Sequence, residues 1–303
     1  MEKLILMLLL FPTLSWGAEK AIYVDREWET SPWAAYQVLN KLTGFNHIIV
    51  MLGNTDPATI KAGSLEYFIN QAHKKGIRIS LCLNVTSSPD TVHFPGYPAD
   101  IAAFFETYAR KYQADGINLD LVRTNGYCKT EPCKADFLQR FGISLDEVLA
   151  DIDYNGWFSP YRPQVSAWNG EVVRRAIEAI KNAVRAIKPN IEISVDSYSH
   201  PCWEMEGAFP NQWINTGLVD HYYVMDYAEQ VDIEALNQYL IPVVAKDKFT
   251  IAIGNFYMFW VKPANEWVDM YSRDPKHVDA LKKSIEGTGS GYAIYSYRFM
   301  RQQ

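Results

Sequence analysis

The sequence predicts a single α/β domain that folds as a closed (β/α)8 barrel. From residue 21 onward, short apolar and β-branched runs alternate with amphipathic segments of helix length, and eight such runs can be counted. Strand–helix–strand units with right-handed connections form either a barrel or an open doubly wound sheet, and eight strands favour the barrel. No GxGxxG motif follows the first run and no P-loop occurs, which weakens the alternative of a nucleotide-binding sheet.

The elements are expected in strict alternation along the chain. The expected strands cover residues 21–25, 47–51, 77–84, 116–123, 191–196, 221–227, 249–256 and 291–298. The expected helices cover residues 32–42, 65–75, 101–112, 170–187, 233–245 and 275–285. Residues 124–167 form a long insertion after the fourth strand, where barrels commonly build a substrate site. The last helix is expected to be reduced or absent, because few residues follow the eighth strand.

The segment DGINLDLVR, residues 115–123, is expected to bring a carboxylate to the mouth of the barrel. Side chains alternate across a strand, so Gly116, Asn118 and Asp120 point inward. The same alternation in the fifth strand places Asp196 inside, level with Asp120. Barrel enzymes carry their chemistry at these carboxyl-terminal strand ends. We therefore expect Asp120 and Asp196 to share one mouth.

Two carboxylates at one mouth suggest acid–base cleavage of an acetal. A glycosidase needs one protonated carboxyl for the leaving oxygen and one ionised carboxylate for the sugar carbon. Asp120 is expected to be the nucleophile or charge stabiliser, and Asp196 the acid–base residue. Asp226 is a third catalytic candidate and ranks lower, because it faces the helices if Met225 and Tyr227 point inward.

Polar and aromatic residues near the other strand ends are candidates for substrate binding. They are Asp25, Asn84, Arg123, Trp203, Glu204, Tyr227, Asn255 and Tyr297. Arg123 is expected to keep Asp120 ionised through a charge-assisted hydrogen bond. Glu204 and Glu206 are also candidate loop acids, although solvated loop charges are commoner. Rings for sugar stacking are offered by Trp157, Trp168, Trp203, Trp213, Tyr257 and Trp260, although packing is the usual role of each.

Composition narrows the partners to weakly charged molecules. The net charge is -6 and no long Lys/Arg run occurs, so neither nucleic acid nor an acidic polymer is expected as a partner. Aromatic residues make up 14% of the chain, which suits a carbohydrate substrate. The histidines show no HxH or HExxH spacing and no GxSxG motif occurs, so we expect no metal, no other cofactor and no serine nucleophile.

Residues 1–17 are typical of a secretory signal peptide, and the barrel is expected to occupy residues 18–303. Lys3 precedes an apolar run that is interrupted by Pro12 and followed by small residues. The run is too short to span a membrane in the mature protein. The sequence therefore predicts a secreted or periplasmic protein that does not contact membrane in its mature form.

The four cysteines would then lie in an oxidising compartment. Cys128 and Cys133 are close enough in sequence to close a small disulfide loop. Cys82 lies inside an expected strand and should be buried. Cys202 remains open as a free thiol or a loop staple.

Motifs of three strands resemble those of glycosyl hydrolase-like (β/α)8 barrel families. DGINLDLVR is similar to the fourth-strand pattern D-[GE]-I-x-x-D-Y-[IV]-R, SVD at residues 194–196 to the fifth-strand motif, and VDHYYVMDY at residues 219–227 to the sixth. The resemblance implies a barrel that acts on polysaccharide, with Asp120 and Asp196 at the matched acidic positions.

The sequence departs from these families at several positions. Leu121 replaces an aromatic residue, Thr124-Asn125 replaces an aromatic-Pro pair, and Trp168-Asn169 replaces Trp-Arg, so substrate contacts should differ. In the chitinase-type barrels of glycoside hydrolase family 18, the catalytic Glu and the sixth-strand Asp would fall at Val122 and Ala228. Their replacement argues against substrate-assisted cleavage of N-acetyl sugars.

The sequence thus favours an exported glycoside hydrolase that cleaves a polysaccharide or oligosaccharide. A non-catalytic carbohydrate-binding barrel is the alternative, motivated by the departures at the chitinase positions. A metal-dependent polysaccharide deacetylase is the weakest reading, because the His and Asp ligand set is missing. The oligomeric state is left open.

Overall fold

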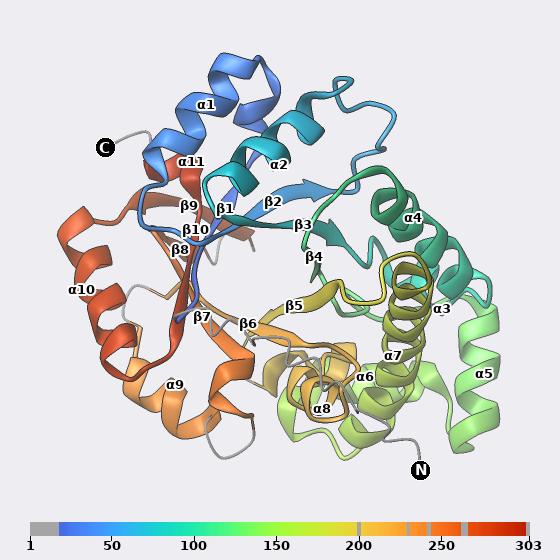
Figure 1. Ribbon diagram of the computed structural model, residues 1–303. Helices are drawn as coiled ribbons and strands as arrows, with labels where there is room; N and C mark the ends of the chain where they lie inside the picture. Colours follow the sequence, from blue (N-terminus) through green and yellow to red (C-terminus); the bar gives the residue numbers. More distant parts are fainter. Residues whose placement is uncertain (1–17, 199–200, 229–230, 241–243, 262–265, 301–303) are drawn as a thin grey trace, which may run out of the picture.

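Eight parallel strands close into a barrel inside a ring of helices (Figure 1), which confirms the predicted fold. The computed structural model describes residues 18–198, 201–228, 231–240, 244–261 and 266–300. The signal peptide expected at residues 1–17 lies outside these ranges. Around the barrel the strands are β1 (Lys20–Val24), β10 (Gly291–Tyr295), β7 (Phe249–Gly254), β6 (His221–Asp226), β5 (Glu192–Tyr198), β4 (Gly116–Asp120), β3 (Arg78–Asn84) and β2 (His47–Gly53).

The helices pack their apolar faces on the outside of the barrel. They are α1 (Pro32–Lys41), α2 (Ser64–Lys74), α3 (Pro89–His93), α4 (Tyr97–Lys111), α7 (Arg162–Ile187), α8 (Pro210–Asn215), α9 (Ile233–Leu240), α10 (Pro275–Gly287) and α11 (Tyr297–Met300). Outward strand residues such as Ile117, Leu119 and Ile193 join this outer core. The last helix, α11, is short, as expected. In the described part of the chain, none of the helices is both long and apolar enough to cross a bilayer.

β4 ends at Asp120, three residues earlier than predicted. The next residue, Leu121, adopts a left-handed backbone conformation with φ of 52°, which an extended strand cannot contain. The Asp120 carboxylate accepts a hydrogen bond from the Leu121 amide at 2.6 Å and fixes this turn. A strained backbone at a non-glycine residue is a common feature of functional sites.

The insertion after β4 forms a subdomain with its own small core. It contains α5 (Glu131–Phe141), α6 (Leu145–Asn155) and the first turns of α7, which begins at Arg162 and not at Gly170 as expected. The predicted disulfide between Cys128 and Cys133 is present. The core of this subdomain includes Phe137, Val148 and, from the amino-terminal part of α7, Trp168.

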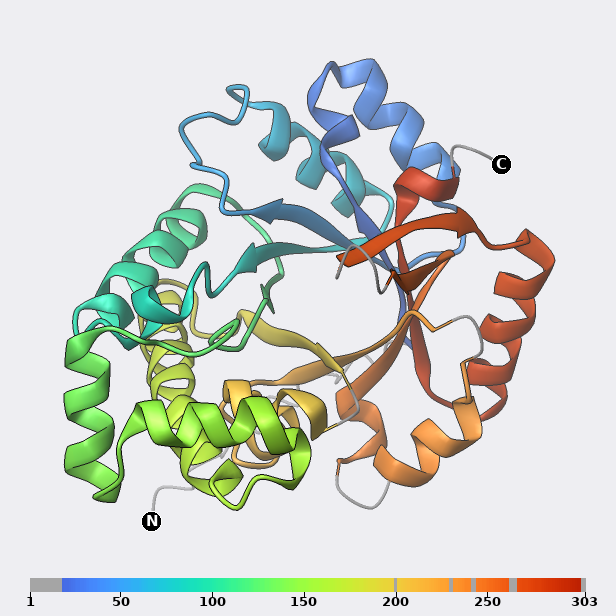
Figure 2. The ribbon, with the colours of Figure 1, turned by 180° about the vertical axis from the view of Figure 1, so that it is seen from behind.

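A two-stranded antiparallel hairpin after β7 was not predicted. It consists of β8 (Phe256–Val261) and β9 (Glu266–Ser272) and belongs to a separate sheet. Residues 256–261 were expected to be a strand end and a loop. Figure 2 looks into the barrel from the end where the strands finish, and both the hairpin and the α5–α6 segment lie on this side. They flank the mouth.

The opposite end of the barrel is filled by a buried charge network. Glu19 accepts hydrogen bonds from Arg78 at 2.9 Å and pairs with His47 at 2.8 Å, and Tyr223 also donates to it. The other nitrogen of His47 lies 2.8 Å from the Ser80 hydroxyl. Gly116 makes room for this network, because a Cβ there would lie 2.3 Å from the Ser80 oxygen. This glycine of the DGINLD segment is therefore required by packing.

Candidate active site

Asp120 and Asp196 lie side by side at the mouth of the barrel. β4 and β5 pair in register up to Leu119 and Val195, so the two aspartates occupy the next position on adjacent strands. Both point inward, because the alternate residues of each strand join the outer core. The strand alternation therefore placed both carboxylates correctly.

The Asp196 carboxyl is held in a buried polar pocket. Only 5% of the residue is exposed. Its Oδ1 accepts hydrogen bonds from the Tyr23 hydroxyl at 2.7 Å and from the Asn118 amide at 2.8 Å. Burial raises the pKa of Asp196 well above its ordinary value, and the charge of Asp120 raises it further. These effects exceed the two hydrogen bonds, which act the other way, so the protonated form of Asp196 is favoured.

Asp120 occupies a more open position. It is partly exposed, and its carboxylate accepts the Leu121 amide. Burial raises the pKa of Asp120 above 3.8, whereas this amide and the charge of Arg123 hold it down. Asp120 is therefore the carboxyl of the pair that ionises more readily. Two carboxyls whose surroundings push their pKa values apart are the arrangement expected of an acid and its ionised partner.

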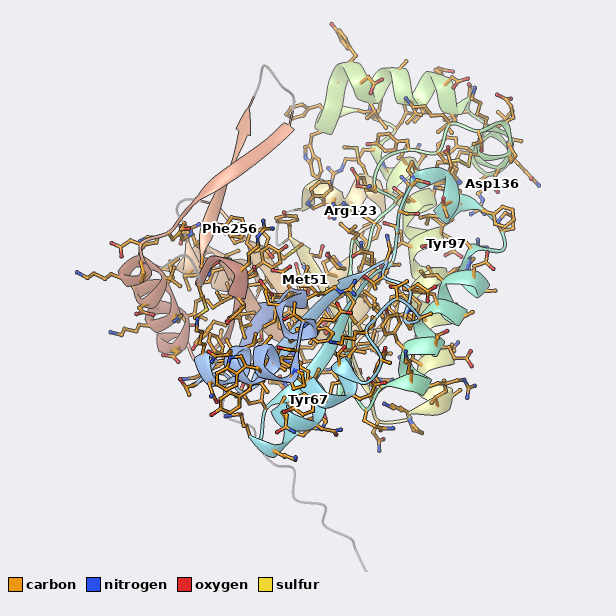
Figure 3. The ribbon with its side chains drawn as sticks, turned by 90° about the horizontal axis from the view of Figure 1, so that it is seen from above. Met51, Tyr67, Tyr97, Arg123, Asp136 and Phe256 are labelled. Atoms are coloured by element: carbon orange, nitrogen blue, oxygen red, sulfur yellow. A yellow bond between two sulfur atoms is a disulfide. The ribbon has the colours of Figure 1, made fainter. Side chains whose placement is uncertain are left out.

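Arg123 does not make the predicted hydrogen bond to Asp120. Its Nε lies 3.4 Å from Oε2 of Glu206, and its guanidinium lies 4.3 Å above the ring of Trp203. The left-handed turn at Leu121 directs the chain away from Asp120 and toward the 3₁₀ helix η3 (Pro201–Glu206). Arg123 therefore acts on Asp120 only through its charge. Figure 3 shows it between the hairpin and the α5–α6 segment.

Glu206 is a third carboxyl on this side of the mouth. Burial raises the pKa of Glu206, and the Arg123 charge with the amides of Asn125 and Gly126 lowers it. The backbone carbonyl of Glu206 also accepts the Thr124 amide at 2.8 Å, which ties η3 to the loop after β4. By contrast, Glu204 is paired with Arg162 at 2.7 Å and lies farther along the rim.

Aromatic rings line the mouth around the two aspartates. Tyr227 stacks on Tyr295 with ring centres 5.3 Å apart, and Tyr295 also contacts Tyr23 edge-on at 5.5 Å. Tyr198, at the end of β5, stacks on Trp203 at 5.7 Å. Two of these five residues, Trp203 and Tyr227, were predicted for substrate binding. Such ring faces suit the flat CH faces of sugars.

Asp226 does not share the barrel interior with the aspartate pair. Its neighbours Met225 and Tyr227 belong to the interior cluster, so Asp226 projects to the other face. There its carboxylate accepts the Ala228 amide at 3.0 Å. Burial raises the pKa of Asp226, and that amide and Arg273 lower it. The alternation argument that ranked it third is thus supported.

The remaining predicted binding residues divide between the rim and the core. Asn84 pairs in register with Asp120 and stays at the mouth. Asp25 lies 3.4 Å from the Ser296 hydroxyl, and burial raises its pKa. Asn255 is buried, and its amide both donates to and accepts from the Ser296 backbone. Tyr297 begins α11 and is buried in the outer core, so it does not reach the mouth.

Among the tryptophans, Trp168 and Trp213 are buried and serve packing, whereas Trp157 is partly exposed. The side chains of Tyr257, Trp260 and Cys202 lie outside the described residues. Cys82 is buried, as predicted, and it lies beneath the aspartate pair. No three His, Cys, Asp or Glu side chains in the described ranges are grouped so that they could hold a metal.

Several site residues were not proposed from the sequence. Tyr23 and Asn118 hold Asp196, and Tyr198 stacks on Trp203. Tyr295, by contrast, was expected at a strand end near the mouth and completes the aromatic lining there. Asn118 could have been found from the sequence, because strand alternation points it into the barrel like Asp120. The role of Tyr23 depends on barrel closure, which brings β1 to face β5 from 173 residues away in sequence.

Comparisons with known proteins agree at the level of the fold. No protein-family model matches the chain, and no curated protein matches it by sequence. Among solved structures it is similar to the glycoside hydrolase domain of PgaB (BpsB) from Bordetella bronchiseptica. The TM-score is 0.70 at 12% identity, and the match covers 94% of this chain and 96% of that domain.

Two further solved structures show the same likeness. A glycoside hydrolase family 18 N-acetylglucosaminidase from Paenibacillus barengoltzii gives a TM-score of 0.55 at 11% identity, covering 94% of this chain and 97% of that one. A beta-galactosidase from Bacillus circulans sp. alkalophilus gives 0.60 at 11% identity, covering 92% of this chain and 50% of that one. The chain therefore has the (β/α)8 barrel fold of glycoside hydrolase domains.

Proposed function

We propose that this protein is a glycoside hydrolase that uses Asp196 as general acid and Asp120 as the ionised partner. The observation that carries the proposal is the pairing of a buried carboxyl, whose pKa is raised by burial and by its neighbour, with a more open carboxyl on adjacent strands at the barrel mouth. The fold similarity to glycoside hydrolase domains and the aromatic lining support a carbohydrate substrate.

The hydrogen bonds of Asp196 favour a proton on its other carboxyl oxygen. Tyr23 and Asn118 both donate to Oδ1, which leaves Oδ2 to carry the proton. Transfer of this proton to the glycosidic oxygen lets the sugar leave, and the same two donors stabilise the carboxylate that remains. Asp120 faces the developing positive charge on the sugar carbon. It acts either as nucleophile, forming a glycosyl ester that water then hydrolyses, or as charge stabiliser while water adds to that carbon.

A release assay separates hydrolysis from binding alone. The wild-type protein should liberate reducing ends from at least one member of a panel of soluble polysaccharides and oligosaccharides. Binding to a glycan without release of reducing ends would instead support the carbohydrate-binding barrel. Buried Val122, at the position of the chitinase Glu, argues against a chitinase mechanism but leaves the aspartate pair intact.

The pH profile of kcat/KM should be bell-shaped. Activity requires ionised Asp120, so it falls as the pH drops through the pKa of that group. It also requires protonated Asp196, so it falls as the pH rises through the raised pKa of that group. Tyr23→Phe removes a donor that favours ionised Asp196, and should move the alkaline limb up by about one pH unit. An unmoved alkaline limb would contradict Asp196 as the acid.

A further inference from the structure

Three aromatic residues at the end of α6 form an exposed patch. Tyr154 and Phe158 are 89% and 90% exposed, and Trp157 between them is partly exposed. We call Tyr154, Trp157 and Phe158 the distal patch. Exposed rings this close together in the sequence are candidates for an interaction surface.

The turn that carries the distal patch is held in place. The carboxylate of Asp151 accepts hydrogen bonds from the Asn155 amide at 2.8 Å and from the Ser159 hydroxyl at 2.5 Å. Beneath the turn lies the apolar core of the insertion, which also contains the disulfide between Cys128 and Cys133. The rings are therefore presented on a prepared support, which lowers the entropic cost of binding.

The distal patch is continuous with the mouth. The Arg162 guanidinium lies 3.3 Å from the centre of the Trp157 ring and donates to Glu204 at 2.7 Å. Glu204 directly follows Trp203, whose ring lies under Arg123 and against Tyr198. Rings and hydrogen-bonding groups thus follow one another from the barrel interior to the end of α6, which suits the CH groups and hydroxyls of a glycan.

The charge beside the distal patch limits the ligand further. α6 carries Asp146, Glu147, Asp151 and Asp153 and no Lys or Arg. Asp146 is paired with Lys134, and Arg162 on the Trp157 ring is paired with Glu204, so these cations are already matched by carboxylates. A chain of carboxylate or sulfate sugars would meet repulsion here. The surface therefore suits a glycan without negative charge.

We propose that the distal patch binds a polysaccharide chain beyond the sugar units held at Asp120 and Asp196, so that the substrate is a polymer without negative charge. This inference rests on the proposed function, because the mouth defines where the chain continues. It predicts that affinity for the polymer depends on residues outside the catalytic pair.

Affinity electrophoresis tests the proposal directly. Native gels would contain glycol chitin, mixed-linkage glucan, xylan or galactan, with alginate as the anionic probe. At least one uncharged polymer should retard the wild type, and the Tyr154→Ala/Phe158→Ala variant should bind it about tenfold more weakly. Trp33→Ala, which removes a 66% exposed ring from α1 on the other side of the barrel (Figure 1), should bind like the wild type.

The outcomes separate this inference from the proposed function. Retardation that the double variant retains, or no retardation of the wild type in any gel, overturns the distal patch as a binding site. Preferential retardation by alginate overturns the assigned charge of the ligand. Asp120→Asn should keep its retardation although it loses turnover. Failure of the wild type to release reducing ends would count against hydrolysis and leave the distal patch standing.

Discussion

Replacing Asp120 by Asn should lower turnover by about 10³-fold and leave the protein folded. The substitution keeps the size of the side chain and removes the charge that the proposed mechanism places at the sugar carbon. It also removes the like charge that helps to keep Asp196 protonated. Reducing-end release measures turnover, and circular dichroism with a melting curve establishes that the variant is folded.

Asp226→Asn is the matched control for this experiment. It makes the same chemical change on β6, where the side chain projects out of the barrel interior. Its turnover should stay within about threefold of the wild type, because it does not contact the aspartate pair. Loss of activity in Asp226→Asn together with normal activity in Asp120→Asn would exchange the roles of the two residues.

Replacing Glu19 by Gln should lower the free energy of unfolding by about 3 kcal/mol. Glu19 is the acceptor for Arg78, His47 and Tyr223 at the closed end of the barrel. Removal of its charge leaves the partly buried Arg78 and the buried His47 and Tyr223 with a weaker partner, which costs more than loss of a surface pair. Urea denaturation followed by fluorescence measures the difference.

Glu286→Gln is the control, because it breaks an ion pair with Lys20 that is exposed on both sides. It should cost less than about 1 kcal/mol. Equal losses in the two variants would show that the buried network contributes no more than a surface pair. Glutamine is close to glutamate in size, so both comparisons isolate charge.

The same network predicts how stability depends on pH. Burial alone would raise the pKa of Glu19, but His47, His221 and Arg78 outweigh burial and lower it far below the ordinary 4.5. A carboxyl whose pKa is lowered by folding contributes stability that is present above 4.5 and is lost as the pH falls below it. Glu19→Gln should therefore flatten the acid side of the stability profile.

The count of eight strand–helix units predicted the barrel, and strand alternation predicted its inward carboxylates. Apolar and polar residues alternate in β4 and β5, and parallel register then sets Asp120 beside Asp196. The same rule showed that Asp226 points away. These predictions succeed because the period of a strand is a local property that tertiary contacts do not change.

Features that depend on distant contacts were not predictable in this way. Arg123 follows Asp120 closely in sequence, yet the left-handed turn at Leu121 carries it to Glu206. Glu19 reaches His47 and Arg78, which are 28 and 59 residues away, and no local pattern marks it. The β8–β9 hairpin adds no strand to the barrel, so a count of eight strands leaves it out.

The protonation state of Asp196 tests the central claim most directly. Infrared difference spectra collected as the pH is raised report the C=O stretch of a protonated carboxyl. We predict such a band near neutral pH in the wild type, its loss only at higher pH, and its absence in Asp196→Asn. A wild-type protein whose carboxyl groups are all ionised near neutral pH would contradict Asp196 as the general acid.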